Sequence, residues 1–416
     1  MSHPIKHVPS HASLLRDVST VRSTSANSRL DAIVVPAARS SLQRLIELSA
    51  QLSVPLVVLC SRQAQADKVA ARVEDTFGAQ ALVVDVPDDY TLPGHQPRTS
   101  DEIFRTVSCG RSSDLSVKRN LGLLLARLRG WRKILFVDDD IYQLRPLDVS
   151  RLAASLDRYP VASMASRYFP DNSVVCHARR LAGLQQDIFV SGAVLGVNTQ
   201  HPALSFFPDI YNEDWFFFAQ HAAARALPKI GEVRQDEYRP FEDPERAGRE
   251  ELGDVLAEGL YALFSSTPGW SLAEQLEAAT GPRHWQYFLE DRQAMISTTR
   301  DRLARLSADD ALQSLAQATE QLSLISPELC VDFIEKWRAD DASWQRLLPA
   351  AGTACSEREA METLGLSTWY AAGYDSGAGS VESWLALSAS LSRSSTRRGA
   401  PGRGWRSPVD SNPSRS

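Results

Sequence analysis

Short apolar runs alternate with amphipathic segments through the first part of the chain. Runs rich in β-branched residues at 31–37, 54–60 and 81–86 predict strands, and the segments 40–52 and 66–78 between them predict helices. The runs are continuously apolar rather than alternating, as in strands that are buried on both faces. Alternation of strand and helix therefore predicts an α/β fold with a parallel sheet and crossover helices.

A further helix and strand follow a loop that contains Pro93, Gly94 and Pro97. The helix is predicted over 112–130, where Gly130 is a suitable stop, and the strand over 131–142. The apolar part of this strand ends in three consecutive acids, Asp138, Asp139 and Asp140. In open α/β sheets ligands bind at the carboxyl ends of the strands, so this is the expected place for a site.

The remaining chain divides into stretches of different character. Another strand is predicted at 159–166, an apolar run at 187–198, and a helix near 211–227, whereas 246–350 is helical throughout. The charge-dense stretch 235–254 is interpreted as a solvated linker. The predicted organisation is a disordered lead-in at 1–29, an α/β domain at 30–245, a helical C-terminal extension at 246–370 and a disordered Ser/Gly/Arg-rich tail at 371–416.

Composition narrows the class of protein. The formal net charge of -6 over 416 residues argues against binding nucleic acid through bulk electrostatics. Five cysteines without CxxC spacing indicate neither a disulfide framework nor a zinc site, which favours a reducing, cytoplasmic location. The sequence shows neither a signal-peptide pattern nor an apolar run of membrane-spanning length, so we expect a soluble protein.

Candidate chemistry is concentrated at Asp138, Asp139 and Asp140. Three adjacent carboxylates at a strand end repel one another unless a cation or hydrogen-bond donors compensate them. Oxygen ligands of this kind suit Mg²⁺ or Mn²⁺, and such an ion can bridge to a diphosphate. The alternative interpretation is an acidic turn that is merely solvated.

The segment 113–142 resembles the central segment of GT-A glycosyltransferases, in particular those similar to family 2. In that family a helix with basic and amide residues precedes the strand that ends in the Asp-x-Asp motif. The resemblance implies a GT-A fold, with a Rossmann-like mixed sheet, and a nucleoside-diphosphate sugar as donor. It further implies that Asp138 contacts the donor ribose, that Asp138 and Asp140 bind Mn²⁺ or Mg²⁺, and that Arg119 and Asn120 face the diphosphate.

A second match lies about 75 residues downstream, where 206–220 resembles the segment that supplies the catalytic base in inverting members of the family. It makes Asp214, with Glu213, the candidate base that takes the proton of an acceptor hydroxyl. The alternative is that both acids complement the dipole of a helix start. Trp215 and Gly192 are the acceptor-side candidates.

On the donor side the chain departs from the family pattern. Family members often carry polar or acidic residues after the first two strands, and here Pro36 and Ser61 stand near those positions. Asp85 ends the third strand and is the candidate substitute, and Asp139 completes the donor-binding set. The nucleobase, the sugar, the acceptor and the stereochemical outcome stay open, as does whether the helical extension mediates self-association.

Other classes of protein also place acids at a strand end. A haloacid-dehalogenase-like phosphohydrolase carries an Asp-x-Asp pair with Mg²⁺, but there the motif normally opens the fold. A receiver domain would use Asp187 and Lys229, which the surrounding sequence does not favour. A GT-A-like domain that binds without turnover is the remaining alternative.

Overall fold

The computed structural model describes residues 5–18, 28–354 and 356–374. The described residues, which end at Tyr374, form one compact unit. The predicted tail lies outside the described residues from position 375 onward. None of the helices in these described ranges is both long and apolar enough to cross a membrane.

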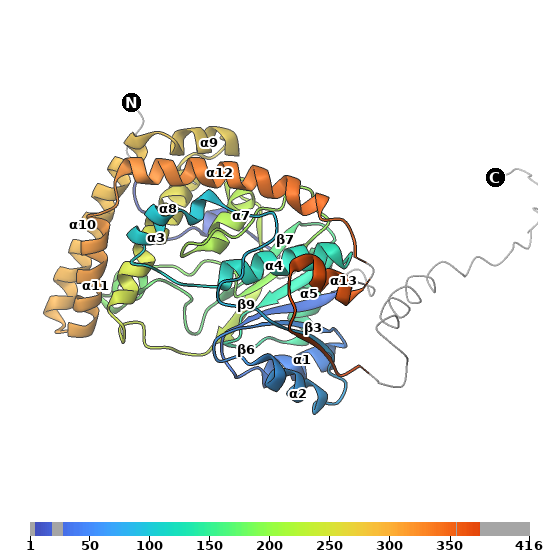
Figure 1. The fold of residues 1–416 in the computed structure, drawn as a ribbon. Helices are drawn as coiled ribbons and strands as arrows, with labels where there is room; N and C mark the ends of the chain where they lie inside the picture. Colours follow the sequence, from blue (N-terminus) through green and yellow to red (C-terminus); the bar gives the residue numbers. More distant parts are fainter. Residues whose placement is uncertain (1–4, 19–27, 355, 375–416) are drawn as a thin grey trace, which may run out of the picture. The chain divides into compact units, whose positions relative to one another are not determined.

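A mixed sheet runs through the unit (Figure 1). Its order is β1-β9-β7-β8-β5-β2-β3-β4-β10, with β6 paired to β9. Neighbours are parallel except that β8 runs antiparallel to β5 and β7, β10 to β4, and β6 to β9. The strands are β1 Leu15–Asp17, β2 Ala32–Ala37, β3 Leu56–Cys60, β4 Ala81–Asp85, β5 Lys133–Val137, β6 Ile141–Gln143, β7 Val161–Ser166, β8 Val194–Asn198, β9 Leu227–Gln235 and β10 Trp369–Ala372. This arrangement confirms the predicted α/β class and its mostly parallel sheet.

Helices flank the sheet, and Figure 1 shows α8 to α12 grouped together, away from α1 and α2. They are α1 Gln43–Leu52, α2 Ala66–Glu74, α3 Glu102–Val107, α4 Leu115–Leu128, α5 Pro146–Ser155, α6 Val174–Leu181, α7 Glu213–Ala223, α8 Glu245–Ser266, α9 Leu272–Ala279, α10 Pro282–Arg305, α11 Asp309–Leu322, α12 Pro327–Ala350 and α13 Glu357–Leu364, with 3-10 turns at Ala12–Leu14 and Arg98–Ser100.

The hydrophobic core explains why these segments fold as they do. Every position of β2, β3 and β5 is buried, which is what their unbroken apolar runs predict. One core cluster joins these strands to the apolar faces of α1, α2 and α5. Burial of each Val or Leu there stabilises the fold by roughly 1.5–3 kcal/mol. The core thus fixes the strand ends at which the polar residues gather.

Three local features differ from the sequence-based predictions or were not covered by them. Residues 5–18, expected in a flexible lead-in, contain β1, which pairs with β9 in register Leu15 with Leu227. The apolar run at 187–198 becomes a strand only from Val194, because its first half forms a loop. Strands β9 and β10 were not predicted, since β9 mixes polar and apolar positions and β10 is a short edge strand.

Candidate functional site

The middle acid of the run after β5 is bonded to the chain's own backbone. The Asp139 Oδ2 atom accepts hydrogen bonds from the N–H groups of Ala38 and Arg39, both at 2.7 Å. Its Oδ1 atom accepts one from the Arg39 guanidinium at 2.8 Å. Asp139 therefore holds the loop between β2 and α1 against the end of β5, a role different from the predicted contact with a donor.

Asp140 carries negative charge that its neighbours compensate only in part. Burial, followed by the nearby Asp138 carboxylate, raises the pKa of Asp140 to about 7. Asp171 acts in the same direction, and the Arg39 guanidinium, 3.0 Å from Asp140 Oδ2, opposes them. A carboxyl group in this state would be stabilised in its ionised form by a further cation.

Arg119, on α4, connects the acid run to the second predicted motif. Its guanidinium is buried, donates to Asp138 at 2.9 and 3.1 Å, and forms an ion pair with Glu213 at the start of α7. Burial lowers its pKa, but the two carboxylates outweigh that effect and hold the pKa of Arg119 above its ordinary value. The two motifs singled out in the sequence thus meet at one side chain.

Gly192 leaves space for this guanidinium. A Cβ atom at position 192 would lie 2.5 Å from Arg119 Nη1, closer than non-bonded atoms approach. The Gly192 N–H also donates to Asp214 Oδ2 at 2.5 Å. Burial and the neighbouring Glu213 raise the pKa of Asp214 to about 8, against the opposing effect of Arg119.

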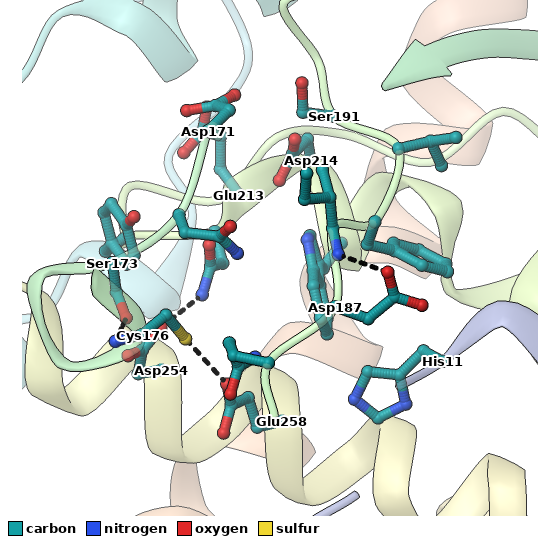
Figure 2. A pocket seen from close by; sticks show the side chains of 18 of the residues that line it. His11, Asp171, Ser173, Cys176, Asp187, Ser191, Glu213, Asp214, Asp254 and Glu258 are labelled. Carbon is teal, nitrogen blue, oxygen red and sulfur yellow. Dashed lines mark hydrogen bonds between the residues drawn. The ribbon is translucent and has the colours of Figure 1, made fainter. Parts of the chain in front are cut away.

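Arg119, Glu213 and Asp214 line a pocket of about 170 Å³, here called the acidic pocket (Figure 2). Trp215 lies on its wall, with its ring centroid 4.4 Å from that of Tyr261 and 5.3 Å from that of His11. Asp171, labelled across the pocket from Asp187 in Figure 2, adds negative charge. The carboxylates that line the acidic pocket are Asp138, Asp171, Asp187, Glu213, Asp214, Asp254 and Glu258.

A larger cavity of about 900 Å³ lies beyond the ends of β3 and β4 and beside the start of α4. Tyr90, Arg62 and Asn120 are among its lining residues, and Arg111 lines both this cavity and the acidic pocket. The Asn120 side chain is also structural, because its amide donates to the Phe207 carbonyl and accepts from the Phe207 N–H, at 2.8 and 2.9 Å.

The remaining predicted donor residues lie elsewhere. Ser61 is buried in a network in which Lys118 Nζ donates to Ser61 Oγ at 2.6 Å and to the Ala37 carbonyl at 2.7 Å. Pro36 is enclosed within β2, and Asp85 is exposed at the end of β4. Neither Pro36 nor Asp85 is among the described residues that line the two cavities.

Sequence reasoning missed several residues of the acidic pocket. Asp254 and Glu258 belong to α8, and Asp254 lies in the stretch 235–254 that was interpreted as a solvated linker. Both are buried, as is the neighbouring Glu251. Their spacing of four residues along α8 was the signal that could have identified them, since such positions share one face.

Ligand atoms suitable for a metal ion converge at a place other than the acid run after β5. In the described ranges, one atom each from Cys176, Asp254 and Glu258 lie within 4.8 Å of one another. Within those same ranges the acid run after β5 does not form such a triple.

Comparison with known proteins does not identify the family of this chain. No protein-family model matches the sequence, and no curated protein matches it either. Among solved structures, a mannosyltransferase from Pyrobaculum calidifontis, in complex with GDP-Man and Mn²⁺, is similar over 77% of this chain and 88% of that chain. The two share 11% sequence identity with a TM-score of 0.38, so the function of this chain has to be argued from its own site.

Proposed function

We propose that this chain is a GT-A-type glycosyltransferase that moves a sugar from a nucleoside-diphosphate sugar to an acceptor hydroxyl. The observation that carries the proposal is the position of Arg119, which pairs with Asp138 on one side and with Glu213 on the other. A buried cation suited to a diphosphate and a candidate base, Asp214, therefore share one pocket.

The two cavities suit the two parts of such a donor. A nucleoside fits the larger cavity, where Tyr90 offers a ring for stacking and the start of α4 offers backbone N–H groups. Arg111 lines both cavities and is placed to meet the diphosphate between them. The sugar then occupies the acidic pocket, where carboxylates accept hydrogen bonds from its hydroxyl groups.

The charge at the end of β5 fits a divalent ion. Burial, followed by the charge of Asp138, raises the pKa of Asp140 against the opposing effect of Arg39. A divalent ion would favour the ionised form of this carboxyl, so Asp138 and Asp140 would hold Mn²⁺ or Mg²⁺ together with the diphosphate. When bound, the ion neutralises charge on the departing nucleotide. Asp139 stays with the backbone of the β2–α1 loop.

Asp214 is the candidate general base. An acid whose pKa lies near the working pH is ionised often enough to act and basic enough to accept a proton. The Gly192 N–H orients one oxygen of Asp214. This role belongs to an inverting reaction; in a retaining one Asp214 orients the acceptor hydroxyl without accepting its proton.

Calorimetric titration of the full chain with UDP and GDP, with and without Mn²⁺, tests the proposal. We expect metal-dependent micromolar binding of one of the two nucleotides. Absence of nucleotide binding under both conditions would contradict the donor site and favour a phosphohydrolase or a non-catalytic domain. Hydrolysis of a phosphomonoester would separate these two.

A further inference from the structure

A second group of potential metal ligands lies in the wall of the acidic pocket, formed by α6 and α8. Cys176 Sγ lies 3.6 Å from Glu258 Oε1, and one oxygen of Asp254 completes the triple within 4.8 Å. Figure 2 shows the sulfur directed at Glu258, with Asp254 beside it. All three residues are buried, so bulk water does not screen the charges of the two carboxylates.

Arg292 compensates the negative charge of these carboxylates only in part. This buried guanidinium donates to Asp254 Oδ2 and to Glu258 Oε2, both at 2.9 Å, and to both oxygens of Glu251. One positive charge thus faces three carboxylates. Asp254 Oδ1 remains with the Asn212 amide, and Glu258 Oε1 remains beside the sulfur.

His7 supplies an independent observation. Its side chain is 5% exposed, and Nε2 lies 2.9 Å from Glu258 Oε2, with which it forms an ion pair when the imidazole is protonated. The segment is held in place because the His7 N–H donates to Asp291 at 2.7 Å. A buried imidazole nitrogen is therefore directed at the same carboxylate that faces Cys176.

The spacing of these atoms is that of donors around one ion. With metal–oxygen bonds near 2.0–2.2 Å and metal–sulfur bonds near 2.3 Å, a sulfur and an oxygen bound to one ion at the tetrahedral angle lie roughly 3.6 Å apart. Cys176 Sγ and Glu258 Oε1 have this separation, 3.6 Å, whereas the 2.9 Å between His7 Nε2 and Glu258 Oε2 is the length of their ion pair.

We propose that Cys176, Asp254 and Glu258 bind a divalent ion of the zinc class, such as Zn²⁺ or Co²⁺, and that His7 becomes a fourth ligand when it leaves its ion pair with Glu258. A thiolate with carboxylate and imidazole ligands favours such an ion over Mg²⁺ or Mn²⁺. Binding through sulfur releases the thiol proton to solvent. The inference does not depend on the proposed transferase activity, and its ligands include neither Asp138 nor Asp140, although Asp138 lines the same pocket.

Titration of the chelator-stripped full chain with Co²⁺ tests this site, because a thiolate bound to Co²⁺ gives an intense charge-transfer absorption that oxygen ligands do not give. We expect the band to saturate at one equivalent of Co²⁺. It should be lost in Cys176→Ser and retained in Cys330→Ser, a matched control at another buried cysteine. Asp140→Ala should also retain it, which separates this site from the proposed donor site.

His7→Ala gives a second measurement if Cys176→Ser fails to fold. Loss of one ligand should weaken Co²⁺ binding at least tenfold while the band persists at saturating Co²⁺. The proposal would be overturned if the wild-type protein developed no charge-transfer band, or if Cys176→Ser kept it. An unchanged Co²⁺ affinity in His7→Ala would remove His7 from the ligand set.

Discussion

Asp139 binds Arg39 through both of its carboxylate oxygens, one to the backbone N–H at 2.7 Å and the other to the guanidinium at 2.8 Å. The middle carboxylate of the acid run is thereby committed to the chain itself. Asp140 shares the same guanidinium at a longer distance of 3.0 Å. Two adjacent acids of identical chemistry thus have different roles, and substitutions should separate them.

Replacement of Asp139 by Ala should destabilise the fold by about 1–3 kcal/mol, because the N–H groups of Ala38 and Arg39 lose their acceptor. Urea unfolding monitored by circular dichroism measures this loss. Asp140→Ala is the matched control, and it should leave stability equal or higher because it removes a carboxylate with a raised pKa. Equal losses in both variants would contradict the assignment.

Asp140→Ala should weaken metal-dependent nucleotide binding at least tenfold while the fold stays intact. The reason is that a proposed metal ligand is lost while Asp139 still holds the β2–α1 loop. Calorimetry with the nucleotide and Mn²⁺ measures the change. If the variant bound nucleotide as the wild type does, Asp140 would have no role in the metal site.

Asp214→Asn should leave nucleotide affinity within about twofold and reduce the rate of transfer by roughly 10²–10⁴-fold, the contribution typical of a general base. The amide oxygen can still accept from the Gly192 N–H, so the local structure should persist. Product formation under saturating donor measures the rate. Turnover close to that of the wild type would exclude Asp214 as the base.

The rate of transfer should rise with pH up to about 8, because the base acts only when ionised and the pKa of Asp214 is raised to about 8 by burial and by Glu213. Stability should change in the opposite direction. The folded state binds this proton more tightly than the unfolded state, whose pKa is near 3.8. The stabilising contribution is therefore complete below pH 3.8 and is lost as pH rises through about 8.

Thermal unfolding of Asp214→Asn beside the wild type checks that sign. The variant should be more stable than the wild type near pH 8, and the advantage should shrink toward pH 4. A difference that was constant over this range would show that Asp214 titrates alike in both states.

Gly192→Ala should displace the Arg119 guanidinium, since the new Cβ would lie 2.5 Å from Nη1. We expect a loss of stability of about 1–3 kcal/mol together with weaker nucleotide binding. Gly231→Ala on β9 is the matched control, because no described atom lies within 4 Å of a Cβ there. If both variants behaved as the wild type does, the close packing of Gly192 on Arg119 would be wrong.

The sequence predicted the parts of this fold that depend on local patterns. The buried strands β2, β3 and β5 were identified because their runs are apolar on both faces. Asp138 and Glu213 were identified as separate motifs, but their joint contact with Arg119 depends on tertiary packing. No local pattern encodes such a contact.

Residues far apart in the chain were missed for the same reason. No recognisable sequence spacing links Cys176 to Glu258, and the two meet because α6 packs against α8. Strand β1 is three residues long, so its pairing with β9 leaves no periodicity to detect. Arg39, by contrast, directly follows a predicted strand and could have been identified from the shared edge of the sheet.

The pairing of β1 with β9 also sets an order of events during synthesis. Residues 15–17 are made more than two hundred residues before their partners at 227–229, so they have no strand to join while the intervening sheet is being translated. Ser10 and His11, which line the acidic pocket, precede this strand directly. The pocket can therefore close only after β9 and α8 have been made, and a nascent chain cannot acquire a complete site before that point.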